Sequence, residues 1–214
     1  MGATDLESAM TTAMTTARDL LIVSLDVPSA RPVERGDLSL ALAGAELADL
    51  LAAEAVTLDD DRIVPGLPPT TDDRLLAEAG AALVRQPPHE SVEDWLWRRG
   101  DGLAQTYANE LETEESAGRP RYRLLAPRSG REVAAEAPDR ARARERWSAR
   151  EPVLASLAAA LGIPEGAAEE PPVPADEALV TVVAAVNGAL TELEAVRQRR
   201  RVEDAAFDNV WRGF

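Results

Sequence analysis

Four polar residues stand directly before an apolar run in the stretch TTDDRLLAEAGAALV, residues 70–84. Two hydroxyls followed by two carboxylates could bind a metal ion or a phosphate, or they could begin a helix. Asp72 and Asp73 would repel a phosphate at a helix N-terminus, which is where anions usually bind. Thr71 suits the N-cap instead, because its hydroxyl can accept an orphan backbone N–H and the carboxylates favour the positive helix end. The local pattern therefore predicts a helix start rather than a ligand site.

Three adjacent carboxylates, Asp59, Asp60 and Asp61, are a second candidate for cation chemistry. They lie between two short apolar stretches, residues 56–58 and 63–64. Adjacent residues of a strand point to opposite faces, and the alternating ligand spacing of a calcium loop is missing. The pattern is typical of a β-hairpin with Asp in its turn. We expect no metal site here.

The third candidate is a basic stretch on an acidic chain. All 23 basic residues are arginine, against 38 acidic residues, which gives a net charge of −15. Residues 117–150 hold ten of these arginines and only four acids. Such a stretch could contact an anionic surface, or its arginines could pair with the protein's own carboxylates. The composition favours the second interpretation.

Several classes of chemistry lack the residues that they need. The 214 residues include no Cys and one His, His89, in a predicted loop after two prolines. The chain has no glycine-rich phosphate loop and no paired carboxylates in an apolar setting. We therefore expect no catalysis, no cofactor and no bound metal. The basic stretch offers only Tyr122 and Trp147 for base stacking, so we expect no nucleic-acid binding.

The elements that must position these residues are mainly helices. Apolar residues are 45% of the chain and aromatic residues 4%, so Ala and Leu supply most of the core. We expect a mainly α fold: one globular helical-bundle domain over residues 18–214, with one or two small β-hairpins and a mobile Pro/Glu-rich loop at 164–176. Residues 1–17 are expected to be disordered. Helices are predicted over residues 37–56, 71–84, 91–112 and 139–162 and from 179 onward, with hairpins at 56–64 and 121–133.

Three further details concern an early apolar run, two interruptions of helices and the C-terminal end. The apolar run at 19–27 fits a strand or a buried helical turn, and periodicity cannot separate the two. Gly100 and Gly102 predict a kink within 91–112, and Pro152 predicts a break in the next helix. Phe207, Val210, Trp211 and Phe214 keep helical spacing, and we expect this amphipathic end to dock on the core.

No stretch of about 18 consecutive apolar residues occurs, so we expect no transmembrane segment. The first residues have no basic region of the kind that begins a secretory signal. We expect a cytoplasmic protein.

The order of these landmarks resembles the Golgi phosphoprotein 3 family, in its bacterial, actinomycete-like branch. A short run, LLIVSLD, precedes the helix LALAGAELADLLAAEAV, and PPTTDDRLLAEAGAALV and PHESVEDWL follow. The resemblance covers residues 18–161 and the last helix. It implies a helical domain without catalysis that lies at the membrane periphery, here its inner face, and binds the headgroup of phosphatidylinositol 4-phosphate.

The resemblance also implies where the headgroup would bind. Arg98 and Arg99 match the basic residues of the family's pocket, and Arg121, Arg123, Arg128 and Arg131 would add contacts to anionic lipid. The family's pocket Trp and one pocket Arg fall at Glu34 and Ala43, so the pocket is degenerate. Guanidinium forks suit a phosphorylated ligand. The alternative is a protein-interaction adaptor that kept the fold and lost lipid binding, with the C-terminal end or the second hairpin as its binding surface.

Overall fold

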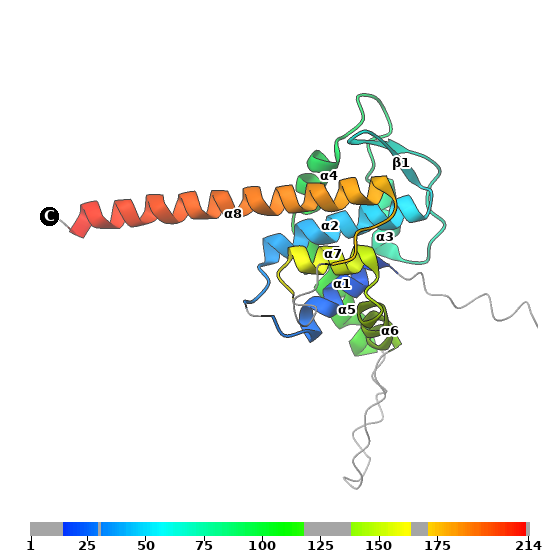
Figure 1. Cartoon of the computed structure of the whole chain (residues 1–214), viewed down its shortest axis with the longest axis horizontal. Coiled ribbons are helices and arrows are strands. Elements are labelled where there is room, and N and C mark those ends of the chain that lie inside the picture. The colour runs from blue at the N-terminus through cyan, green and yellow to red at the C-terminus, as the bar shows by residue number, and fades with distance from the viewer. Residues whose placement is uncertain (1–14, 30, 118–137, 164–170, 213–214) are drawn as a thin grey trace, which may run out of the picture.

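Helix α2 (Arg35–Ala52) lies at the centre of the fold in the computed structural model (Figure 1). The structure describes residues 15–29, 31–117, 138–163 and 171–212. Helix α2 packs against most of the other helices, and twelve of its residues are buried. Its neighbours are α1 (Thr16–Asp26), α3 (Arg74–Ala81), α4 (Val92–Arg99), α5 (Leu103–Ala117), α7 (Pro152–Ala160) and α8 (Glu177–Arg212).

The remaining elements lie outside this central layer. Helix α6 (Pro138–Ser148) packs on α1 and α7. Strands β1 (Val56–Asp59) and β2 (Arg62–Pro65) form an antiparallel hairpin that pairs Asp59 with Arg62. The predicted mainly α fold is therefore confirmed, with one hairpin among the described residues. The second predicted hairpin, residues 121–133, and the first part of the 164–176 loop lie outside them.

Polar groups of α2 hold the ends of two neighbouring helices. The Asp49 carboxylate accepts the backbone N–H of Thr16 at 2.8 and 3.0 Å and that of Ala17 at 3.3 Å, and so caps α1. The Ser39 hydroxyl accepts the N–H of Ala104 at 3.0 Å in the first turn of α5. Because the first four N–H groups of a helix have no partner within the helix, these contacts fix where α1 and α5 begin.

Several local predictions are confirmed and others need correction. Residues 19–26 are helical, which settles the choice between strand and helix, and α1 begins at Thr16. The helix after residue 70 is capped by Asp73, whose carboxylate accepts the N–H of Leu76 at 2.8 Å, and not by Thr71. The hydroxyl of Thr71 instead accepts the N–H of Asp73. The kink predicted at Gly100 and Gly102 is a full break between α4 and α5.

Helix α8 crosses α2 and then extends beyond the body of the molecule (Figure 1). Over Glu177–Asp204, α8 is long and apolar enough, by length and composition alone, to cross a membrane, and no other described helix is. Core helices meet the same criterion, and Val182, Val186 and Ala189 of α8 are buried against the body. The C-terminal end does not dock on the core as expected, because the helix continues outward to Arg212.

The crossing of α2 and α8 depends on Gly44. A Cβ at this position would lie 2.4 Å from Cγ2 of Val186. We expect Gly44→Ala to lower the free energy of unfolding by about 1–3 kcal/mol through overpacking. Val186→Ala in the same chain should recover part of the loss by making room. Urea denaturation measures both, and Gly188→Ala is the control, because nothing lies within 4 Å of its added Cβ. Equal stability of Gly44→Ala and wild type would contradict this close approach.

The cap that Asp49 forms on α1 also makes the free energy of unfolding depend on pH. Burial raises the pKa of Asp49 from 3.8 to about 7, although hydrogen bonds from Thr16 and Ala17 lower it. Between pH 3.8 and 7 the folded state keeps a proton on Asp49 that the unfolded state has lost. The contribution of Asp49 to the free energy of unfolding is therefore complete below pH 3.8 and is lost as pH rises through 7.

Between pH 5 and 7 we expect the free energy of unfolding of wild type to fall more steeply than that of Asp49→Asn. The difference in slope is at most about 1.4 kcal/mol per pH unit. Denaturant titrations at several pH values measure it. The control is Asp72→Asn, which removes an exposed carboxylate. Parallel pH profiles for wild type and Asp49→Asn would show that Asp49 is ionised throughout.

Candidate functional site

Arg98 lies in the last turn of α4, and its guanidinium pairs with a carboxylate of the protein itself. Its Nε and Nη2 donate to the two carboxylate oxygens of Glu90, each at 2.7 Å. Nη2 also donates to the carbonyl of Ala82 at 3.2 Å, and the guanidinium lies 5.3 Å from the ring centroid of Trp95. The two-pronged pair with Glu90 uses the donors that a phosphate would need.

Arg99 points into the core instead. Its Nε and Nη2 donate to both oxygens of Glu46 at 2.7 Å, and Nη2 also donates to the carbonyl of Leu75 at 3.3 Å. The Glu46 side chain is fully buried, and the Arg99 side chain is 16% exposed. The hydroxyl of Tyr107 donates to the same carboxylate at 3.1 Å. Burial raises the pKa of Glu46, although the hydrogen bonds from Arg99 and Tyr107 lower it.

The two predicted site arginines therefore do not converge. Arg98 neutralises Glu90 at the surface, and Arg99 neutralises Glu46 inside the molecule. Arg121, Arg123, Arg128 and Arg131 lie outside the described residues.

The described part of the basic stretch pairs with the protein's own acids. On α6, Arg146 donates to the buried Asp19 at 2.6 Å, and Arg142 pairs with Asp139 at 3.0 Å. Arg140 forms an ion pair with Asp26. The pairs with Asp19 and Asp26 tie α6 to α1, and all three pairs support the interpretation that these arginines serve the fold.

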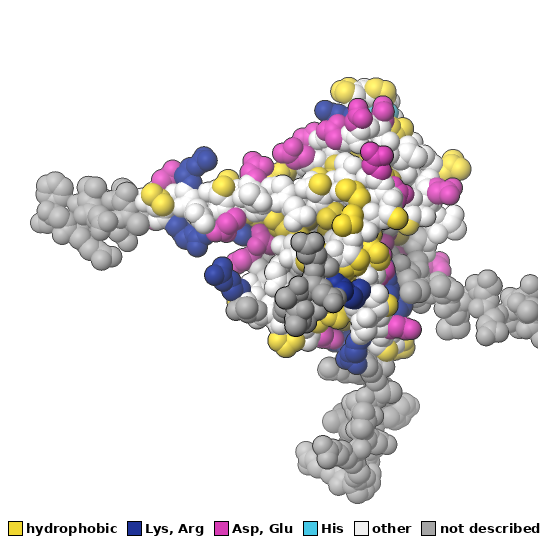
Figure 2. Space-filling model, in the orientation of Figure 1, with side chains coloured by type: hydrophobic (Ala, Val, Ile, Leu, Met, Phe, Trp, Pro, Cys, Tyr) yellow, Lys and Arg dark blue, Asp and Glu magenta, His cyan; other side chains and the backbone are white. Residues whose placement is uncertain are grey.

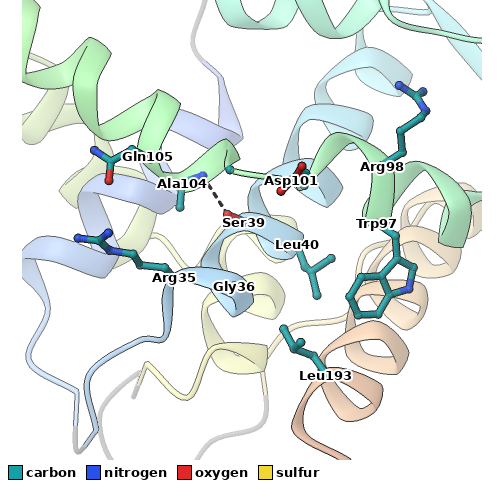
Figure 3. A pocket seen from close by; sticks show the side chains of 12 residues that line it. Arg35, Gly36, Ser39, Leu40, Trp97, Arg98, Asp101, Ala104, Gln105 and Leu193 are labelled. Atoms are coloured by element: carbon teal, nitrogen blue, oxygen red, sulfur yellow. Dashed lines mark hydrogen bonds between the residues drawn. The ribbon is translucent and has the colours of Figure 1, made fainter. Parts of the chain in front are cut away.

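A groove lies beside Arg98 (Figure 3). It has a volume of about 730 Å³ and lies between the start of α2, the turn from α4 to α5, and α8. Twelve residues line it: Arg35, Gly36, Ser39, Leu40, Trp97, Arg98, Gly100, Asp101, Gly102, Ala104, Gln105 and Leu193. Trp97 and Leu193 face each other across one end, whereas the guanidinium of Arg98 points away (Figure 3).

The chemistry of the groove is mostly apolar. Leu40, Leu193 and the indole of Trp97, which is 37% exposed, form an apolar wall. Arg35 is exposed at the other end, and no described carboxylate pairs with it. Asp101 lies between the two ends, so the groove is not uniformly basic. No three described His, Asp or Glu side chains are grouped to hold a metal ion.

Sequence reasoning did not identify Arg35, Trp97 or Asp101 as site residues. One signal was available for Trp97. The buried face of α4 runs through Val92, Trp95 and Leu96, and position 97 lies off that face. An indole at an outward position of an amphipathic helix is a candidate contact residue. The residues that line the groove lie at 35–40, 97–105 and 193. They are far apart in the sequence, so no motif or periodicity indicates that they lie together.

Comparison with known proteins gives one match. A family model described as Golgi phosphoprotein 3 (GPP34) matches residues 17–211, which run from α1 almost to the end of α8. No curated protein and no solved structure matches the chain. The match confirms the family resemblance read from the sequence, and the bacterial, actinomycete-like branch stays a prediction.

The buried ion pair of Arg99 and Glu46 leads to a prediction about the free energy of unfolding. We expect Arg99→Met to lower the free energy of unfolding by about 3–5 kcal/mol, because it leaves Glu46 buried without its partner. The double variant Glu46→Gln with Arg99→Met should recover much of this loss. Arg98→Met removes a guanidinium that is 44% exposed from a Glu90 side chain that is 9% exposed, and it should cost about 1–2 kcal/mol, less than Arg99→Met. Urea denaturation measures all three, and similar small losses for Arg98→Met and Arg99→Met would contradict a structural role for Arg99.

Proposed function

The chain belongs to the Golgi phosphoprotein 3 (GPP34) family, and we propose that it is a non-enzymatic binding domain whose working surface is the groove between α2, α4, α5 and α8. Its occupant is an apolar segment of a polypeptide. In this role the domain is an adaptor that kept the family's fold.

One observation carries this proposal: Arg98 and Arg99 are both engaged with carboxylates of the protein itself. A phosphate at Arg99 would have to displace a buried acid, which would leave that acid without a partner at a cost of several kcal/mol. Displacing Glu90 from Arg98 costs less, but a single arginine gives no converging set of donors.

The groove has the features of a polypeptide-binding surface. Its volume of about 730 Å³ is that of a pocket for several side chains. Exposed Trp and Arg are enriched at the energetic centres of protein interfaces, and Trp97 and Arg35 stand at opposite ends of the groove. Apolar side chains would contact Leu40, Trp97 and Leu193, and a carboxylate of the bound segment would pair with Arg35.

An anionic lipid headgroup is the second candidate. Arg35 is in the first turn of α2, where the helix dipole adds to its positive charge, and it has no described carboxylate partner. Family membership supports this candidate as well. Asp101 opposes it, because a carboxylate in the same groove repels a phosphate.

Site-specific photo-cross-linking tests the proposal. A photoreactive phenylalanine analogue in place of Trp97 should form covalent adducts with polypeptide in cells, because position 97 faces the groove. The matched control is the same analogue at Ala77, which is exposed on the outer side of α3. Adducts are detected by their mass after denaturing electrophoresis. We expect adducts at position 97 and none at position 77.

Vesicle flotation separates the two candidates. If the full chain floats with vesicles that contain phosphatidylinositol 4-phosphate, and Arg35→Glu abolishes flotation, the headgroup replaces the polypeptide as the occupant. An absence of adducts at position 97 would overturn the polypeptide proposal.

A further inference from the structure

Two charged side chains of opposite sign in the groove, Arg35 and Asp101, are not engaged by the protein itself. Three of the twelve lining residues are charged, and the third, Arg98, pairs with Glu90 and points away (Figure 3). Arg35 and Asp101 are both exposed, and among the described residues neither side chain has a hydrogen-bond or ion-pair partner. The groove therefore offers one free cation and one free anion within its described lining.

Both charges stand on elements that the core holds in place. Arg35 lies one turn before Ser39 in α2, and Asp101 lies three residues before Ala104 in α5. The Ser39 hydroxyl accepts the N–H of Ala104 at 3.0 Å and so joins the two helices (Figure 3). A Cβ on Gly100 would lie 3.3 Å from the carbonyl oxygen of Ser39, so the turn before α5 packs directly on α2. The packing of α2 and α5 thus fixes the separation of the two charges, and a fixed arrangement can select a ligand.

We propose that the polypeptide segment in the groove carries an acidic residue, a basic residue and apolar residues in that order. The carboxylate pairs with Arg35, a Lys or Arg pairs with Asp101, and the apolar side chains contact Trp97 and Leu193. The order follows from the position of Asp101 between Arg35 and the apolar end (Figure 3). This inference rests on the proposed function, because it names the charge pattern of the segment that fills the groove.

The two charges fix the direction of the segment more than its affinity. Ion pairs at an exposed rim add little to binding, whereas like charges placed together are strongly unfavourable. A segment that lay in the opposite direction would bring its carboxylate to the apolar end beside Trp97 and its apolar side chains to Arg35. Only one direction satisfies both charges and the apolar wall, so the groove discriminates between segments of the same composition.

The acidic residue of the segment is the specific part of this pattern. The chain has a net charge of −15, and acidic side chains gather at the end of the body that carries the hairpin (Figure 2). This field attracts any basic segment at long range. Arg35 lies in the first turn of α2, where the helix dipole adds to its positive charge, so a purely basic segment would be repelled there. The groove should therefore prefer a segment of mixed charge to a polybasic one.

Selection from random peptides displayed on phage tests the pattern, with the immobilised full chain as bait. Wild type should enrich peptides with the order acidic, basic, apolar. The double variant Arg35→Glu with Asp101→Arg exchanges the two charges, so it should enrich the order basic, acidic, apolar. Both positions are exposed, so the variants should fold like wild type, and urea denaturation checks this.

Fluorescence anisotropy of a labelled peptide enriched on wild type measures the contribution of each charge. Arg35→Glu and Asp101→Arg should each weaken binding on the order of 10-fold, because like charges then face each other. The double variant should regain affinity for the same peptide with its acidic and basic residues exchanged. Arg200→Glu and Glu112→Arg make the same changes of charge at exposed positions outside the groove, and they should leave the affinity unchanged.

The outcomes separate this inference from the proposed function. An exchange of charge order between the two enriched sets supports both. Apolar peptides without a charge pattern, or equal binding by wild type, Arg35→Glu and Asp101→Arg, overturn the inference and leave the groove as a polypeptide site. Enrichment of polybasic peptides overturns it as well, because the field of the whole molecule then selects the segment. A failure of wild type to enrich any peptide counts against the proposed function and this inference together.

Discussion

Helix α2 is buried along most of its length, yet it carries polar side chains that must all be satisfied. Ser39, Glu46 and Asp49 follow one another at helical spacing. They accept hydrogen bonds from α5, from α4 and α5, and from α1, respectively. A buried polar group costs free energy unless it is hydrogen-bonded, so each of these residues admits few positions of its partner. Apolar contacts supply the driving force of folding, but they tolerate small shifts. The polar side chains of α2 therefore fix where α1 and α5 start and how α4 is oriented.

The same constraint explains how the arginines are used. Arg99 and Arg146 each enclose a buried carboxylate, Glu46 and Asp19 respectively, and join helices that are distant in the sequence. The planar fork of arginine suits this role, because it can bond to two oxygens of one carboxylate and still reach a carbonyl. A guanidinium used in this way is not available to a ligand. The binding surface that we propose, the groove between α2, α4, α5 and α8, is accordingly lined by side chains that do not pair inside the core, such as Arg35 and Trp97.

Much of the local structure could be predicted from the sequence, because the interactions that set it lie within a few residues. The start of α4 next to residue 91, the hairpin at Asp59–Asp61 and the break before Pro152 are examples. The N-cap of α3 was predicted at Thr71, two residues before the observed cap at Asp73. Both residue types suit an N-cap, and a hydrogen bond from the hydroxyl of Thr15 favours Asp73. The roles of Arg99 and Trp97 could not be predicted. Glu46 lies 53 positions before Arg99, and the groove beside Trp97 exists only once α8 has returned to α2.

The place of α8 in the chain order has a consequence for synthesis. The strip of α2 around Gly44 is completed by Val182 and Val186, which are among the last residues that the ribosome adds to the core. Until those residues leave the exit tunnel, a nascent chain presents this apolar strip to its surroundings. A chain whose translation stopped before α8 would contain the seven described helices α1–α7, with an apolar strip of the central helix α2 exposed. Chaperones bind such exposed apolar surfaces.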